Sequence, residues 1–336
     1  MTDMLKMLCN TCGTSGREDA VRDAIVSLID GFCDYKIDPL GNIIAFKKGK
    51  KTPKKRIMLD AHMDEVGFIA TYINEQGLIS FSSVGGINTE CILSQRVIFE
   101  NGTVGVIGSK PMHLLSADAR KKLPETDSLY IDIGAASGEE AKKLLSPGDT
   151  AVFYPNFLEQ DSIITSKAID DRAGCAILIS LLREDSEYDF YATFTVQEEV
   201  GSRGAATAAF AVEPDYCLCL ESTTASDIEG VSGARRVCEL GQGPVISFMD
   251  RGTLYDRELF DLANGLSMPH QVKSMVAGGN NSAAIHKSRG GVKTLAISVP
   301  CRYLHSASCM SSLDDIKGAY DIAKAMLQKL GEAEND

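Results

Sequence analysis

Four apolar runs in the sequence each stop shortly before an acidic residue or a histidine. They cover residues 56–60, 191–196, 216–220 and 294–300, and a shorter run covers residues 163–166. Runs of this kind are typical of strands buried in an α/β sheet. Ligands of such a sheet gather at the carboxyl ends of its strands. We therefore expect the following side chains to meet at one edge of a sheet: His62, Asp170, Glu198, Glu199, Glu221 and His305.

The pattern of apolar and polar residues changes at about residue 68. From about residue 68 to residue 161, short alternating segments are broken by Gly and Asn, a pattern typical of a small β barrel or sandwich. Helical patterns over 173–182 and 313–330 then alternate with apolar runs. The 336 residues are enough for two domains. We predict an α/β domain formed by residues 1–67 and 162–336, with an all-β domain inserted at 68–161.

Charge and cysteine content exclude several classes of partner. The net charge is −12 and no basic stripe is present, so nucleic acid and anionic membranes are not expected as partners. No apolar run reaches the ~20 residues that a membrane-spanning helix needs. The start lacks the layout of a signal peptide, so we expect the ten cysteines to be reduced thiols of a cytoplasmic protein. Cys9 and Cys12 have CxxC spacing but no second pair, which favours two ordinary helix residues over a metal site.

The first motif places His62 at a predicted strand end with Asp64 two residues later. Histidine is a common metal ligand, and its second ring nitrogen usually needs a carboxylate or carbonyl partner. Asp64 is the natural candidate for that partner. Alone, this spacing is equally typical of a surface histidine near a helix cap.

The second motif places Asp170, Asp171 and Arg172 directly before a helical pattern. Aspartate is favoured at helix N-caps, and spacing alone favours that interpretation. In the alternative, one of the two carboxylates bridges two metal ions while its neighbour and the arginine orient it.

The third motif is the adjacent pair Glu198 and Glu199, which follows an apolar run. Burying two carboxylates is costly unless they are compensated. A metal ion would compensate one, and the other could act as a general base. With Glu221 and His305 at further strand ends, the set suffices for a pair of divalent ions. Zn²⁺, Co²⁺ and Mn²⁺ accept such mixed imidazole and carboxylate ligands.

The order of these motifs resembles the tetrahedral (TET) aminopeptidases, a family that includes glutamyl aminopeptidases and endoglucanase-M-like metallopeptidases. The resemblance extends over nearly the whole chain. It implies an α/β/α metallopeptidase domain with a mixed sheet and a barrel-like insertion. It also implies two divalent metal ions per subunit, with Zn²⁺ or Co²⁺ preferred to Mn²⁺, and removal of the first residue of short peptides. The motifs are HxDE at 62–65, DDR at 170–172, EE at 198–199, the acid at 221 and RYxHS at 302–306.

The resemblance also implies a role for each residue. Glu198 corresponds to the general base, and Asp64 to the partner of His62. The peptide bond after the bridging aspartate is cis in the family, which is expected of Asp170–Asp171 here. The implied metal ligands are His62 and Glu221 on one ion, Glu199 and His305 on the other, and Asp170 between them.

The chain departs from the family pattern at two positions. Glu221 stands where several relatives have Asp, and it is longer by one methylene but still a competent ligand. Asn281 replaces an acid in the segment 278–282, which removes one negative charge near the site without removing a ligand.

The resemblance further implies a homo-oligomer. The insertion would mediate dimer contacts, and six dimers would close into a tetrahedral dodecamer. The polar segment near residues 116–125 would reach a neighbouring active site.

Three other functions compete with the aminopeptidase. A related di-metal amidohydrolase or carboxypeptidase-like enzyme would use the same ligands on an N-acyl or carboxy-terminal bond. A glycosidase is disfavoured because its carboxylate pair needs neither histidines nor metal. A non-catalytic assembly subunit is disfavoured by the intact ligand set. For the substrate's first side chain, Arg235, Arg236 or Arg251 could favour acidic groups, although solvated surface arginines are at least as common.

Overall fold

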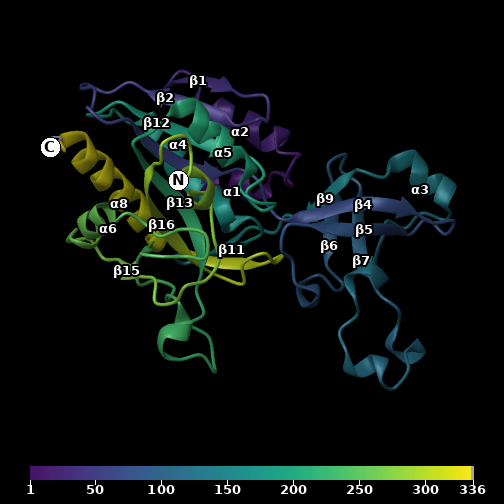
Figure 1. Cartoon of the computed structure of the whole chain (residues 1–336). Coiled ribbons are helices and arrows are strands. Elements are labelled where there is room, and N and C mark those ends of the chain that lie inside the picture. Colours follow the sequence, from purple (N-terminus) through teal and green to yellow (C-terminus); the bar gives the residue numbers. More distant parts are fainter. Residues whose placement is uncertain (334–336) are drawn as a thin grey trace.

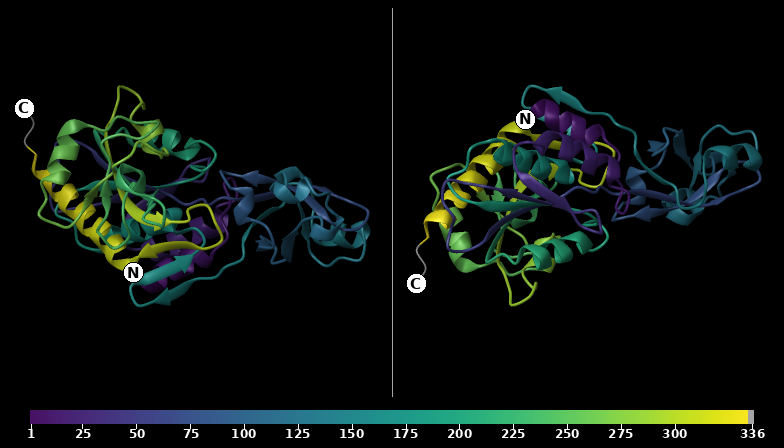
Figure 2. Two further views of the ribbon diagram at one scale, coloured as in Figure 1. Left: turned by 90° about the horizontal axis from the view of Figure 1, so that it is seen from below. Right: turned by 90° about the horizontal axis from the view of Figure 1, so that it is seen from above.

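The computed structural model describes residues 1–333, which form an α/β body and a separate closed barrel. The barrel projects from one end of the body (Figures 1 and 2). This arrangement confirms the predicted fold class, a mixed-sheet α/β domain with an inserted all-β barrel. In the part of the chain that the structure describes, no helix is both long and apolar enough to cross a membrane.

The body is built on one sheet of eleven strands. Its centre is parallel, because β12, β3, β13 and β16 all run in the same direction, and antiparallel strands lie on either side. In order across the sheet, the strands are β1 (Asp34–Ile37), β2 (Ile43–Lys47), β12 (Phe190–Thr195), β3 (Ile57–His62), β13 (Tyr216–Thr224), β16 (Lys293–Arg302), β17 (Cys309–Ser312), β11 (Ile163–Ser166) and β10 (Leu158–Gln160). Two short strands, β14 (Val245–Ile246) and β15 (Gln271–Val272), extend from β16.

Helices cover both faces of this sheet, which explains why its central strands are almost entirely apolar. Alternate residues of β3 point to opposite faces: Leu59 belongs to the larger core with α4 and α8, and Met58 to the smaller core with α5. The helices of the first face are α1 (Thr2–Asn10), α2 (Asp19–Ile29), α4 (Ile169–Arg183), α6 (Arg257–Asn264) and α8 (Leu313–Glu332). Those of the second are α5 (Arg203–Val212) and α7 (Ser282–Ile285).

The barrel has its own apolar core, separate from that of the body. Phe68 packs edge-on against Phe81 and Phe153, with both ring-centroid distances 5.3 Å. Around the barrel, the strands are β4 (Gly67–Ile73), β5 (Ile79–Val84), β8 (Tyr130–Asp132), β7 (Val104–Gly108), β6 (Arg96–Phe99) and β9 (Thr150–Phe153). One helix, α3 (Gly138–Leu144), lies beside β4.

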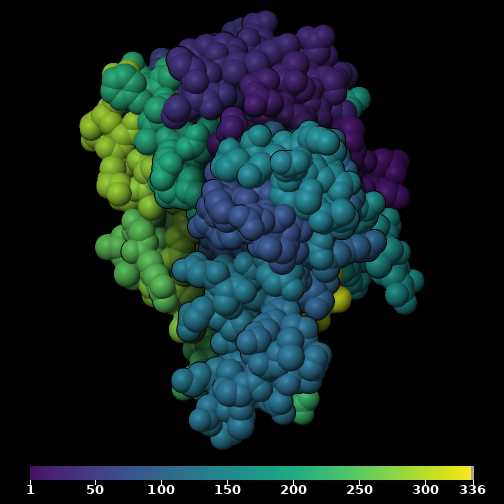
Figure 3. All heavy atoms as spheres, turned by 90° about the vertical axis from the view of Figure 1, so that its right-hand side faces the viewer, coloured from purple at the N-terminus to yellow at the C-terminus, as the bar shows by residue number. Residues whose placement is uncertain are grey.

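The segment between β7 and β8 forms a lobe that extends away from the barrel (Figures 1 and 3). It contains three short 3₁₀ turns, at Met112–Leu114, Ala119–Lys121 and Thr126–Ser128. One detail differs from the predicted insertion at 68–161: β10 falls inside that range but pairs with β11 in the large sheet. The domain limits themselves stay a prediction.

Candidate metal centre

The sequence-predicted site residues come together at the carboxyl ends of the central strands. His62 is the last residue of β3, and Glu221 lies near the end of β13. Thr195 of β12 is in register with His62, so the loop that follows β12 delivers Glu198 and Glu199 to the same edge. Asp170 lies in the first turn of α4, and His305 in the loop between β16 and β17. The parallel arrangement of the central strands therefore produces the predicted convergence.

The carboxylate of Asp170 lies between the two histidine rings. Its Oδ1 is 3.4 Å from Nε2 of His62, and its Oδ2 is 3.7 Å from Nε2 of His305. On the far side of His62, Nε2 lies 3.8 Å from Oε2 of Glu221. On the far side of His305, Nε2 lies 3.3 Å from Oε1 of Glu199. The arrangement is thus two imidazole–carboxylate pairs with one carboxylate between them.

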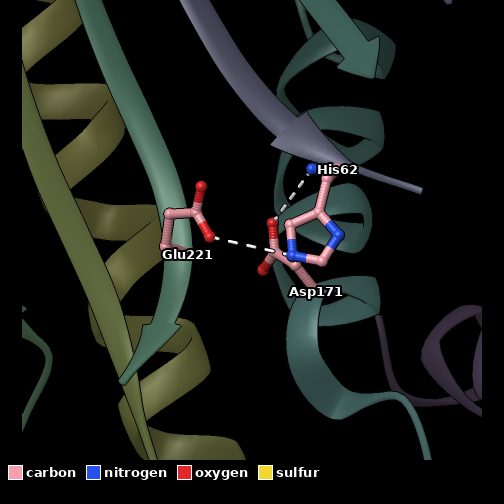
Figure 4. Close-up of side chains that lie close together, drawn as sticks. All are labelled: His62, Asp171 and Glu221. Atoms are coloured by element: carbon pink, nitrogen blue, oxygen red, sulfur yellow. Dashed lines mark hydrogen bonds and ion pairs between the residues drawn. The ribbon is translucent and has the colours of Figure 1, made fainter. Parts of the chain in front are cut away.

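Asp171 is the neighbour that sequence spacing could not separate from Asp170. It is fully buried, and it forms with His62 and Glu221 a group close enough to hold a cation (Figure 4). However, its Oδ2 accepts a hydrogen bond from the backbone N–H of His62 (3.3 Å), and its Oδ1 accepts one from Gly174 (3.0 Å). Its carboxylate therefore secures the start of α4 to β3. The peptide bond between Asp170 and Asp171 is cis, as predicted.

The donor set fits a divalent cation. Oδ1 of Asp170 is buried and has no hydrogen-bond partner among the described residues, so it is free to bind one. A second group, His62 with Asp170 and Glu199, also has its ligand atoms within 4.8 Å of one another. Imidazole nitrogens and carboxylate oxygens are the ligands that Zn²⁺ and Co²⁺ accept.

Burial and mutual proximity shift the protonation of these groups. Burial raises the pKa of Glu198 to about 8; the neighbouring His62 opposes this shift, and Glu199 adds to it. Burial also raises the pKa of Glu221 well above its usual range. Burial lowers the pKa of His305, but the carboxylates of Asp170 and Glu199 outweigh it and raise that pKa to about 11. A divalent cation favours the deprotonated form of both residue types.

Asp64 organises both sides of the cluster. Its Oδ2 accepts hydrogen bonds from Oγ of Ser15 (2.6 Å) and from the backbone N–H of Glu199 (3.1 Å). Nδ1 of His62 lies 3.1 Å from the carbonyl oxygen of Asp64 and 3.4 Å from its Oδ1. Either oxygen can accept a hydrogen bond from Nδ1–H, which leaves Nε2 as the unprotonated nitrogen that can bind a metal.

A buried ion network lies beneath the site. Both oxygens of Glu65 accept hydrogen bonds from Nζ of Lys167, at 2.7 and 2.8 Å, and Oε1 is also 3.2 Å from Nη2 of Arg172. All three side chains are at most 3% exposed. The network ties the HxDE segment to the DDR segment. No role was predicted for Glu65, the acid that ends the HxDE motif, or for Lys167, a charged residue three positions before Asp170.

The structure gives a physical reason for Asn281. Its backbone N–H lies 3.3 Å from Oε1 of Glu221, and its side-chain amide donates to Oδ2 of Asp60 and to Oγ1 of Thr195, both at 2.8 Å. Asp60 is itself fully buried. An acid at position 281 would face that carboxylate, whereas the amide donates to it. Asp60 was not among the predicted site residues.

A pocket of about 260 Å³ opens beside the cluster. Asp170 and His305 form one wall, and the segment 278–280 with Asp250 and Lys273 forms others. None of the three arginines proposed from the sequence lines it. Two are exposed, and the third pairs with a glutamate at 2.6 Å; these are Arg235, Arg251 and Arg236. Lys273 also lines the pocket, and the sequence carried no signal for this position.

Comparison with known proteins places the chain among peptidases. The profile of the M42 glutamyl aminopeptidase family matches residues 41–322. A relative from Acetivibrio thermocellus is 39% identical over 326 residues, covering 95% of this chain and 96% of its own. The lysyl aminopeptidase of Pyrococcus furiosus is 32% identical, covering 98% of this chain and 97% of its own.

Solved structures share the fold over the whole chain. The TET1 peptidase of Pyrococcus horikoshii, which can assemble into a tetrahedron or a large octahedral shell, is 34% identical with a TM-score of 0.85. That match covers 97% of this chain and 98% of the other. The likeness therefore includes the body, the barrel and the connection between them.

Proposed function

Because the chain belongs to the M42 glutamyl aminopeptidase family, we propose that it is a di-metal aminopeptidase that releases the first residue of short peptides. Family membership makes it a hydrolase of peptide bonds. The proposal of two metal ions rests on the position of the Asp170 carboxylate. Its Oδ1 is 3.4 Å from Nε2 of His62, and its Oδ2 is 3.7 Å from Nε2 of His305. A carboxylate in this position can bridge two ions.

The residues divide into two ligand sets around Asp170. His62 and Glu221 would hold one ion, and Glu199 and His305 the other. Zn²⁺ and Co²⁺ suit these ligands best, and Mn²⁺ is the third possibility. When bound, the ions act as Lewis acids on the scissile carbonyl and make the attacking water more acidic.

Glu198 would act as the general base. Its Oε2 is 4.0 Å from Nε2 of His62, which places it beside the proposed ligands, and the resemblance to the family assigns it the role of base. In this role it takes a proton from the attacking water and passes it to the leaving amine. With both ions bound, one of them would be available to hold the free α-amino group of the substrate, which an acylated amine could not offer as a ligand.

Two features bear on assembly and location. The TET1 peptidase resembles this chain over both body and barrel, and its assembly supports homo-oligomerisation. In this proposal the barrel would form the dimer contacts, and six dimers would close into a dodecamer. The lobe near residues 116–125 would then approach a neighbouring subunit. All ten cysteines are free in the structure, which supports a reducing, cytoplasmic setting.

One assay tests this function against its rivals. Protein freed of metal with a chelator would be reloaded with Zn²⁺, Co²⁺ or Mn²⁺ and given matched aminoacyl p-nitroanilides, with a free or an acetylated amine. We expect metal-dependent cleavage of the free-amine substrates only. Cleavage of the acetylated ones would indicate an amidohydrolase instead. Failure to bind any of these metals would indicate a non-catalytic subunit.

A further inference from the structure

The loop that carries the two adjacent glutamates begins at a residue with an uncommon backbone conformation. Gln197, directly before Glu198, has a φ of +59°, in the left-handed region that residues other than glycine rarely adopt. Such a conformation persists only where surrounding contacts fix it. Because the chain leaves β12 at Thr195, the conformation of Gln197 sets the direction in which Glu198 enters the site.

Side chains from distant parts of the chain hold the backbone of this loop. Four successive backbone N–H groups, at 196–199, each donate a hydrogen bond to a side-chain oxygen. Asn42 accepts the first at 2.9 Å, and Glu18 accepts the second at 3.1 Å. The carboxylate of Asp64 accepts the other two. Glu18 is therefore the acceptor for Gln197, the residue with the left-handed backbone.

The Glu18 side chain is itself fixed in place. Glu18 is 5% exposed and lies directly before α2. Its Oε1, which accepts the N–H of Gln197, also accepts a hydrogen bond from the backbone N–H of Gly16 at 2.7 Å. In the same segment, Oγ of Ser15 donates to Oδ2 of Asp64 at 2.6 Å. Residues 15–18 thus support both of the carboxylates that hold the N–H groups at 197–199.

The contact between Glu18 and Gln197 depends on an acceptor oxygen more than on a negative charge. Burial raises the pKa of the Glu18 carboxyl to about 7, against the hydrogen bonds from Gly16 and Gln197, which lower it. A neutral carboxyl group keeps one oxygen that can accept a hydrogen bond. A glutamine side chain, which also has an Oε1, can therefore replace it.

We infer that Glu18 is a positioning residue for the general base: it holds Gln197 in its left-handed conformation and so fixes where the Glu198 carboxylate lies. The inference rests on the proposed aminopeptidase function and adds a residue to it. A displacement of about 1 Å in a reacting group can cost about 100-fold in rate. Asp64 holds the N–H of Glu199 at 3.1 Å without help from Glu18, so the metal ligand should depend on Glu18 less than the base does.

The test compares Glu18→Ala and Glu18→Gln in metal-loaded enzyme, with aminoacyl p-nitroanilides as substrates. Glu18→Ala removes the acceptor and should lower kcat by about 10- to 100-fold. KM and the metal affinity, measured by competition with a chelator, should change little, because the loss falls on the chemical step. Glu18→Gln keeps an acceptor oxygen at the same reach and should recover most of kcat.

A double variant shows whether Glu18 acts through Glu198. If Glu18 only positions the base, Glu18→Ala should cost almost nothing further in kcat when it is added to Glu198→Gln. Amide hydrogen exchange gives a second readout that does not depend on activity. The amides at 196–199 should exchange faster in Glu18→Ala than in wild type, because one of their acceptors is lost.

Asp189→Ala is the matched control. Asp189 lies directly before β12, at the opposite end of the strand from Gln197, and is 7% exposed. Its Oδ1 accepts a hydrogen bond from the backbone N–H of Gly49 at 2.7 Å, so it too is a buried carboxylate that holds a backbone amide. Its removal should lower stability in the same way as Glu18→Ala but leave kcat unchanged.

The outcomes separate this inference from the function on which it rests. Near-normal kcat in Glu18→Ala, or an equal loss of kcat with and without the Glu198 carboxylate, would overturn the positioning role while the aminopeptidase stands. If wild type cleaves no aminoacyl substrate under any metal, the proposed function fails and this inference fails with it.

Discussion

The carboxylate of Asp64 accepts a hydrogen bond from the backbone N–H of Glu198 at 2.9 Å, across 134 positions of the sequence. This contact joins the end of β3 to the loop after β12. The other oxygen of Asp64 holds the N–H of Glu199 at 3.1 Å. With the backbone fixed at both positions, the two glutamate side chains separate: Glu198 lies near His62, and Glu199 near His305. The buried carboxylate of Asp64 therefore holds Glu198 and Glu199 in positions where their side chains have different neighbours.

Replacing Asp64 with Asn should impair both metal binding and turnover. The amide keeps the shape but loses the charge that holds two backbone N–H groups and lies beside His62. Changes in such supporting groups typically cost about 10–100-fold in metal affinity or activity. Competition with a chelator measures the affinity, and steady-state kinetics the turnover. Asp261→Asn, at an exposed residue of α6 that pairs with Arg257 at 2.7 Å, is the control. Unchanged metal affinity in Asp64→Asn would contradict the role given to this residue.

Replacing Glu198 with Gln should separate chemistry from metal binding. The variant should retain its metal, because Glu198 is not one of the proposed ligands, and lose about 10²–10⁴-fold in kcat, the usual contribution of a general base. Elemental analysis and kinetics on one sample measure both. Glu199→Gln is the informative comparison, since it should lose metal as well. Near-normal turnover in Glu198→Gln would rule out its assignment as the base.

Replacing Asn281 with Asp should destabilise the fold. The substitution removes the amide that donates to Asp60 at 2.8 Å and places two buried carboxylates against each other. An uncompensated buried charge costs roughly 3–5 kcal/mol, and urea unfolding would measure it. The double variant with Asp60→Asn restores one donor and one acceptor, and should recover part of the loss. Purely additive effects in this cycle would show that the two residues are not coupled.

The pair of Asp227 and Arg302 should make stability depend on pH. Arg302 ends β16, just before the loop that carries His305, and contacts Asp227 at 2.6 and 2.7 Å. Hydrogen bonds from Arg302 lower the pKa of Asp227 below its usual value of 3.8. The stabilisation is therefore fully present above that value and is lost as the pH falls through the lowered pKa.

Asp227→Asn should accordingly lower the free energy of unfolding by about 1–3 kcal/mol near neutral pH. The difference from wild type should shrink in acid, where the wild-type carboxylate is protonated. Denaturant unfolding between about pH 7 and pH 2 would follow it, again with Asp261→Asn as the control. A difference that stays constant with pH would exclude the charged pair as its source.

The central part of the fold could be predicted because burial leaves a readable pattern. β3, β12, β13 and β16 are covered on both faces, so their sequences are continuous apolar runs. The edge strands β1 and β10 were not predicted. All their residues are exposed, and a strand without a buried face has no apolar period to read.

The sequence by itself determined which residues could form the site, because an acid or histidine at the end of an apolar run must lie at the edge of the sheet. The sequence did not determine which contacts each member of an adjacent pair of acids would make. Asp170 and Asp171 differ only in local backbone direction and hydrogen-bond partners.

Two features depend on the tertiary structure alone. One is the presence of Lys273 in the pocket, and the other is the contact with Asp60 that explains the amide at position 281. Lys273 stands alone in the sequence, and Asn281 is 221 positions from Asp60. Contacts of this kind arise when separate loops pack together. A short-range pattern of apolar residues shows which face of a helix or strand is buried. It does not show which distant side chain that helix or strand will contact.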